Sequence, residues 1–230
     1  MILLRHHSVT LLELAGTGFY NGRTMNFLAH LYLAGDQDAH RLGGLMGDFV
    51  KGPLPGPLAD DLAFGVFLHR RIDSFADAHP AFRRSRQRIG EVRRRYGGVL
   101  VDMFYDHFLA KEWTRFHPTT LAEFSQTAYD LLQRQAAVLP ESMQPIARAM
   151  AAGDWLTSYA ETAYIGQAVD RMALRRLRHP NPLAGGVEEL LADYAGFRED
   201  FFTFMADARV FSQGLLVDGT GVFGEGQPGN

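Results

Sequence analysis

The sequence predicts an all-α fold in a single compact multi-helix domain. Apolar residues recur at helical spacing through most of the chain, and no segment shows the apolar–polar alternation of a strand. Clusters of Gly and Pro interrupt this periodicity, and Thr119 or Thr120 with Glu123 is typical of a helix N-cap box. With 230 residues, 47% of them apolar, the chain can form one substantial core. We expect helices over residues 26–35, 37–50, 59–77, 80–96, 98–115, 119–138, 142–152, 154–176 with a break, and 186–208.

The two ends of the chain differ in composition from the helical part. We expect residues 1–24 to form an extension outside the core, residues 25–211 to form the helical domain, and the Gly-rich residues 212–230 to form a flexible tail. The longest run without a charged side chain, Thr24–Gly35, has twelve residues. A membrane span needs about 20, so an integral membrane protein is excluded. The N-terminal residues do not match a signal peptide, and we expect the protein to act in the cytoplasm.

The chain contains no cysteine. This excludes disulfide scaffolds, thiolate nucleophiles and metal sites that use cysteine ligands. A bound metal would therefore have to be held by histidine and carboxylate side chains. The candidate ligands are therefore ionisable groups at positions that the helical periodicity assigns to the interior.

The expected helix 59–77 carries two such groups. His69 and Asp73 are one turn apart on an apolar stripe, so both side chains can reach the same point. Burial of an unpartnered charge is costly, and a bound metal is one usual compensation. The alternative is that Asp73 pairs with Arg70 or Arg71 as a structural ion pair. These two arginines lie off the stripe and could instead face an anionic ligand.

The expected helix 98–115 repeats this pattern. Asp102 and Asp106 lie one turn apart on an apolar stripe, where two carboxylates would repel each other if nothing lay between them. His107 follows directly and projects about 100° away. Asp106 and His107 could supply two ligands, or one ligand and one group that orients it.

Two further segments contain single polar residues among apolar ones. His30 lies in the apolar sequence Asn26-Phe27-Leu28-Ala29-His30, and Asp48 lies in a segment whose glycines permit close backbone approach. Taken alone, each is most simply explained as a satisfied core residue. The occurrence of His69 with Asp73, and of Asp102 with Asp106 and His107, in one chain favours a metal site.

These segments resemble the acyl carrier protein phosphodiesterase family. The resemblance spans Met25 to about Phe204 and rests on the order and separation of four motifs. They are Asn26-Phe27-Leu28-Ala29-His30, the stretch 44–52 around Asp48-Phe49, His69-Arg70-Arg71-Ile72-Asp73, and Asp106-His107-Phe108-Leu109.

The resemblance implies an all-helical enzyme that is distantly similar to HD-type metal-dependent phosphohydrolases. The implied reaction removes 4′-phosphopantetheine from the serine of holo-acyl carrier protein and returns the apo form. The implied cofactor is a divalent metal, Mn²⁺ first, with Mg²⁺, Fe²⁺ or Zn²⁺ as alternatives. The implied metal-site residues are His30, Asp48, His69, Asp73, Asp106 and His107. Asp106 and His107 are also catalytic candidates, and from its position Arg70 or Arg71 could stabilise the developing charge.

A basic segment suggests how the partner is recognised. Residues 82–95 contain seven arginines and one glutamate, although the whole chain has a net charge of −3. Because carrier proteins of this class are small and acidic, we expect a docking surface formed by Arg83, Arg84, Arg86 and Arg88. The alternative is a solvated cationic face without a partner.

Two other functions remain open from the sequence alone. One is an HD-like phosphohydrolase that acts on a nucleotide or another small phosphate ester. The other is a non-catalytic helical module that binds an acidic protein. RNA binding through the arginine segment is disfavoured, because the net charge is negative and a basic aromatic platform is missing.

Overall fold

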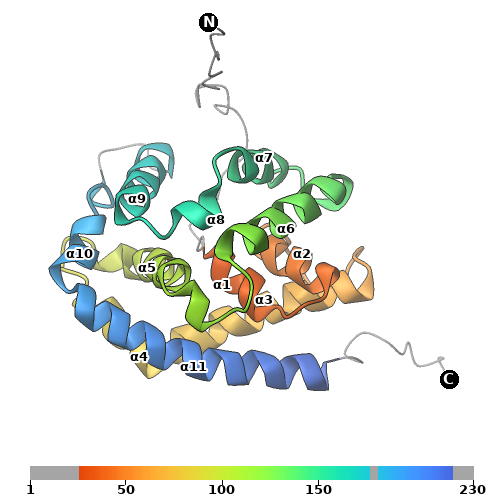
Figure 1. The fold of residues 1–230 in the computed structure, drawn as a ribbon, viewed down its shortest axis with the longest axis horizontal. Coiled ribbons are helices and arrows are strands. Elements are labelled where there is room, and N and C mark those ends of the chain that lie inside the picture. The colour runs from red at the N-terminus through yellow and green to blue at the C-terminus, as the bar shows by residue number, and fades with distance from the viewer. Residues whose placement is uncertain (1–25, 177–180, 220–230) are drawn as a thin grey trace, which may run out of the picture.

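The computed structural model describes residues 26–176 and 181–219, and within these ranges it contains α-helices and short 3₁₀ helices but no strand (Figure 1). The all-α prediction is therefore confirmed. The α-helices are α1 (Phe27–Leu33), α2 (Asp38–Met46), α3 (Asp60–Ala78), α4 (Pro80–Arg88), α5 (Gly97–Lys111), α6 (Leu121–Arg134), α7 (Gln144–Ala152), α8 (Trp155–Ser158), α9 (Thr162–Arg176), α10 (Val187–Ala192) and α11 (Tyr194–Asp218).

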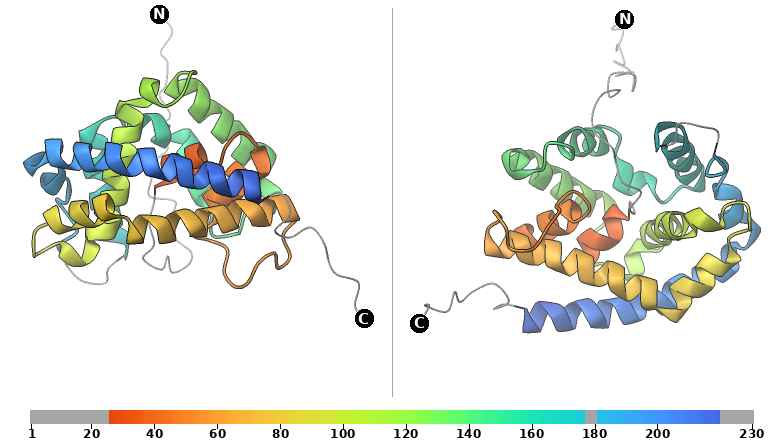
Figure 2. Two further views of the ribbon diagram at one scale, coloured as in Figure 1. Left: turned by 90° about the horizontal axis from the view of Figure 1, so that it is seen from below. Right: turned by 180° about the vertical axis from the view of Figure 1, so that it is seen from behind.

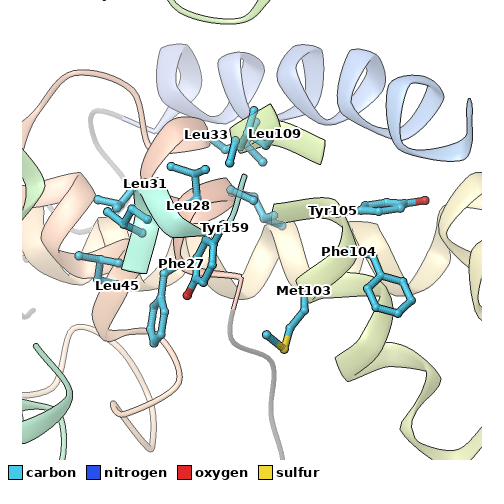
Figure 3. Packing of buried hydrophobic residues seen from close by; sticks show 14 of the residues in the cluster. Phe27, Leu28, Leu31, Leu33, Leu45, Met103, Phe104, Tyr105, Leu109 and Tyr159 are labelled. Carbon is cyan, nitrogen blue, oxygen red and sulfur yellow. The ribbon is translucent and has the colours of Figure 1, made fainter. Parts of the chain in front are cut away.

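Helix α5 is the central element of the core. Every residue from Leu100 to Ala110 is buried, because apolar side chains occupy almost all faces of this helix. Helices α1, α4, α9 and α11 pack around it, and α3 and α4 run beside the long helix α11 (Figures 1 and 2). Figure 3 shows side chains of α1 and α5 gathered in this core together with Tyr159. The short helix α1 is thus held in the interior.

Helices α2 and α3 cross at very close range. A Cβ atom at Gly43 would lie 2.4 Å from the carbonyl oxygen of Leu62, and one at Gly65 would lie 2.5 Å from the carbonyl oxygen of His40. Only glycine permits this approach. The crossing brings the C-terminal end of α2 and the segment that follows it against the middle of α3, where His69 lies.

A buried carboxylate joins α4 to α11. Asp200 of α11 is 1% exposed and accepts hydrogen bonds from Nε of Arg84 at 2.8 Å and from Nε of Arg88 at 2.9 Å. Ser85 also donates to this carboxylate, at 3.2 Å. The two arginines neutralise a charge that would otherwise be costly to bury.

Several helix ends differ from the sequence predictions. The helix expected over 80–96 ends at Arg88, because the chain becomes extended at Ile89. The helix expected over 186–208 is divided at Asp193, whose side chain caps the start of α11, and α11 then continues to Asp218. The expected flexible tail is therefore helical over 212–218. Residues 220–230 of that tail and residues 1–24 lie outside the described residues, and the domain boundaries stay predictions.

Other local predictions are confirmed. The helix expected over 154–176 is broken between α8 and α9. Thr120 and Glu123 form the capping box at the start of α6, with each side chain bonded to the backbone N–H of the other residue. None of the described helices combines the length and the apolar character needed to cross a membrane.

Candidate metal and active site

A pocket of about 330 Å³ opens where the segment after α2 meets α3. Backbone and side chains of this segment form one wall, and one face of α3 forms the other. The pocket is polar, because two carboxylates, an imidazole and two cationic groups line it. Its lining residues are Gly47, Asp48, Val50, Lys51, Gly52, His69, Arg70 and Asp73.

His30, His69 and Asp73 form a group of metal-ligand type at this pocket. One donor atom from each lies within 4.8 Å of the others. Nε2 of His30 is 3.1 Å from Oδ1 of Asp73, and Nε2 of His69 is 3.3 Å from Oδ2 of the same carboxylate. The sequence prediction that His69 and Asp73 meet at one point is confirmed. The structure adds His30, which α1 brings to the same carboxylate.

The local fold fixes the orientation of the His69 ring. Its Nδ1 lies 2.7 Å from the carbonyl oxygen of Gly44, which can only accept a hydrogen bond, so Nδ1 carries a proton. When the ring is neutral, its lone pair is therefore on Nε2 and points toward Asp73. The His30 ring stacks against the His69 ring, with 3.8 Å between the two ring centres. A Cβ at Gly47 would lie 2.1 Å from Cγ of His69, so glycine is required there.

Asp48 lies next to this group. One of its carboxylate oxygens is 3.7 Å from Nε2 of His69, and its side chain is 6% exposed. The turn that follows α2 places it there, with the N–H groups of Phe49 and Val50 both bonded to the carbonyl of Met46. Asp48 thus adds a second negative charge beside the His69 imidazole.

Burial and charge shift the pKa values of these groups in different directions. Burial lowers the pKa of His30, and the neighbouring His69 lowers it further. Burial alone would lower the pKa of His69, but Asp48 and Asp73 outweigh it and raise the pKa to about 9. Burial alone would raise the pKa of Asp73, but the two imidazoles hold it well below its usual range. The site without a cation therefore combines carboxylates with one protonated imidazole at neutral pH.

The two arginines that follow His69 have different surroundings. Arg70 lines the pocket, and its guanidinium donates to the carbonyl oxygens of Gly52 at 2.9 Å and Val50 at 3.0 Å. Arg71 is exposed, with its guanidinium carbon 6.0 Å from the ring centre of Phe211 on α11. Of the two, only Arg70 is among the residues that line the pocket.

The structure does not bring Asp106 into the donor group. Its carboxylate is 1% exposed and accepts hydrogen bonds from the backbone N–H groups of Leu28 at 3.0 Å and Ala29 at 2.8 Å. Burial raises the pKa of Asp106 to about 8, although both backbone hydrogen bonds oppose this shift. Asp106 therefore binds the start of α1, the helix that carries His30.

His107 is also engaged elsewhere. Nδ1 of His107 lies 2.8 Å from the carbonyl oxygen of Tyr159, and its Nε2 lies 2.8 Å from the hydroxyl of Tyr194. Burial lowers its pKa, which favours the neutral ring, with Nδ1 donating to the Tyr159 carbonyl and Nε2 accepting from the Tyr194 hydroxyl. His107 thus connects α5 to the α8–α9 turn and to the start of α11, away from the three donor residues.

Comparison with known proteins places this chain in a family. The sequence model described as acyl carrier protein phosphodiesterase matches residues 25–208. The chain belongs to the acyl carrier protein phosphodiesterase family. A protein of that name from Pectobacterium atrosepticum is 36% identical over 181 residues, which cover 78% of this chain and 93% of the relative. Its namesakes from Photorhabdus laumondii and Yersinia pestis are 34% and 33% identical, over 91% and 93% of their lengths. No solved structure matches the chain significantly.

The match to the acyl carrier protein phosphodiesterase family includes every residue of the pocket and of the donor group. It also includes two pocket residues that the sequence reasoning did not single out. Lys51 is exposed at the pocket, and its ammonium group donates to the carbonyl oxygen of Asp48 at 2.5 Å. Gly47 allows His69 to approach, and the only signal of this role was its place in a segment with several glycines.

The four arginines that were expected to form a docking surface are not all free to bind a partner. Arg84 and Arg88 are committed to Asp200, as described above, and Arg88 also pairs with Asp193. Arg83 and Arg86 are exposed and bond to the backbone and side chain of Asp77, respectively. Arg84 and Arg88 thus hold α11 through the buried Asp200, whereas Arg83 and Arg86 bond to the nearby Asp77, and all four arginines are exposed at the surface.

Proposed function

We propose that this protein hydrolyses the phosphodiester that joins 4′-phosphopantetheine to the serine of holo-acyl carrier protein, releasing apo-acyl carrier protein. The observation that carries the proposal is the convergence of two imidazoles and a carboxylate beside a polar pocket, in a chain of the acyl carrier protein phosphodiesterase family. The cytoplasm as the place of action and a likeness to HD-type hydrolases stay predictions.

The donor group fits a divalent cation. Nε2 of both imidazoles is buried and makes no well-aligned hydrogen bond with any described residue, although Asp73 is close to each. Two imidazole nitrogens and a carboxylate suit Mn²⁺, Fe²⁺ or Zn²⁺, and Mn²⁺ is the cation we propose. His30, His69 and Asp73 would hold it, with Asp48 beside them. A cation bound there would supply Lewis acidity and lower the pKa of water.

The two cationic residues of the pocket bind the phosphoryl group of the substrate. Arg70 is oriented by two carbonyl oxygens, so its guanidinium is placed before substrate arrives. Arg70 stabilises the negative charge that develops on the phosphoryl oxygens, and Lys51 adds a second cation at the same pocket. Asp73 and the Gly44 carbonyl keep the His69 ring in one orientation throughout.

Purified protein incubated with holo-acyl carrier protein and Mn²⁺ tests this function. Mass spectrometry should record loss of the prosthetic arm from the carrier protein, and chelation by EDTA should stop the loss. Free nucleotides and small phosphodiesters, offered in parallel, should be hydrolysed far more slowly. Hydrolysis of those compounds with an unchanged carrier protein would favour the small-ester phosphohydrolase. Binding of the carrier protein without any mass loss would favour a non-catalytic module.

The affinity for Mn²⁺ should rise with pH. Because the pKa of His69 is raised to about 9 in the cation-free site, a cation must displace one proton from it below that pH. Displacement of one proton gives about a tenfold gain in apparent affinity per pH unit between pH 6 and 8. Isothermal titration in buffers of different ionisation enthalpy measures both the affinity and the proton release. An affinity independent of pH would contradict His69 as a ligand.

The two pairs of arginines on α4 should respond differently to substitution. We propose that Arg83 and Arg86 contact the acidic carrier protein, so the double change to Ala raises KM at low salt and leaves stability nearly unchanged. The double change of Arg84 and Arg88 to Ala should lower the free energy of unfolding by about 3 kcal/mol, because it leaves Asp200 buried without a cation. Urea unfolding and steady-state kinetics on both variants separate the two roles. An unchanged KM for the first variant would contradict docking by these arginines.

A further inference from the structure

We propose that Asp106 is a positioning residue, which holds His30 in the donor group by binding the N-terminus of α1, and that it is not a ligand of the cation. This inference rests on the proposed function in one respect, since it takes the three-residue donor group as the cation site. Its structural part concerns only how α1 is held.

The first backbone N–H groups of a helix have no partner within the helix. In α1 the preceding residue, Asn26, makes no side-chain capping hydrogen bond, and its Oδ1 is buried without a partner among the described residues. Asp106 supplies the missing acceptors from α5, with one carboxylate oxygen on Leu28 N–H and the other on Ala29 N–H.

The position of His30 depends on this contact. His30 directly follows Ala29, and its N–H makes the first backbone bond of the helix, to the carbonyl of Asn26 at 3.2 Å. Helix α1 has seven residues, which is too short to be stable by itself. Leu28 and Leu31 bury it against the core, and Asp106 fixes its end.

Both oxygens of Asp106 take part in this role. Each of its oxygens already accepts a backbone hydrogen bond, and the side chain lies on α5 within the fully buried stretch from Leu100 to Ala110. The donor residues come from α1 and α3 instead. Asp106 therefore acts on the cation site through α1.

Backbone amide exchange, followed by NMR without metal, tests how α1 is held. In Asp106→Asn, which keeps one acceptor oxygen, the Leu28 and Ala29 amides should exchange about tenfold faster, as expected for loss of one such hydrogen bond. Asp106→Ala should show a larger effect. The matched control is His107→Gln, which alters the next residue of α5 but leaves both capping bonds in place. Its Leu28 and Ala29 amides should change only as much as those of α5.

Mn²⁺ binding then distinguishes positioning from ligation. The affinity of Asp106→Asn should fall by about 10- to 100-fold, whereas the electron paramagnetic resonance spectrum of the saturated protein should match the wild type because the ligands are the same. A lower affinity with unchanged Leu28 and Ala29 exchange, or an altered spectrum at saturation, would overturn the inference. Failure of the wild type to bind Mn²⁺ would refute the cation site, while the exchange data would still decide whether Asp106 holds α1.

Discussion

Replacement of Asp73 by Ala should lower kcat/KM for holo-acyl carrier protein by about 10³-fold, since a catalytic cation contributes several kcal/mol to the transition state. This carboxylate faces both imidazoles, so its loss removes one donor and the charge that orients the other two. Stoichiometric Mn²⁺ binding, measured by titration calorimetry, should be lost as well.

Asp77→Ala is the matched control for this change. Asp77 lies one turn further along α3, and its exposed carboxylate bonds only at the surface, 3.4 Å from Arg86. The control should keep Mn²⁺ binding and kcat. If Asp73→Ala retained wild-type Mn²⁺ affinity, the assignment of the donor group would be wrong.

Addition of a single methyl group at Gly47 should be nearly as damaging. In Gly47→Ala the new Cβ would lie 2.1 Å from one His69 ring atom and 2.2 Å from another, and real Cβ atoms do not approach so closely. The ring would have to move away from the Gly44 carbonyl and from Asp73. We expect kcat/KM to fall by about 10²-fold, the size of effect expected when a catalytic group is displaced by about 1 Å.

Gly98→Ala provides the comparison, because a Cβ there has open space around it. It lies in the first turn of α5 and should leave activity unchanged, with a small gain in stability from the better helix former. NMR spectra of the His69 side chain in both variants report whether the ring has moved. A Gly47→Ala variant with full activity would show that His69 does not need its present position.

The helices were predictable from the sequence because their apolar stripes are regular and their ends carry Gly or Pro. Their exact limits were not, because tertiary contacts decide them. Periodicity alone did not reveal that Asp193 would cap α11, or that the chain would turn at Ile89, where the amide of Gly90 bonds to Glu189. The continuation of α11 to Asp218 was missed because Gly214 suggested an irregular tail.

The sequence identified the donor residues of α3 because one-turn spacing on a single helix is a local property. It could not rank His30 above Asp106 and His107, since that depends on how α1 lies against α5. The sequence pattern of an inward-facing carboxylate is the same whether the carboxylate binds a cation or a helix end. The arginines of α4 are a similar case, because the partner of Arg84 and Arg88 is Asp200, far along the chain.

The support of α1 by α5 has a consequence for how the protein matures during synthesis. His30, His69 and Asp73 are all synthesised before Asp106, whose carboxylate binds the N-terminus of α1. A nascent chain that ends at the C-terminus of α3 contains all three donors but lacks the Asp106 carboxylate that binds the start of α1. On the proposed assignment, the donor group can hold a cation only after translation has passed α5.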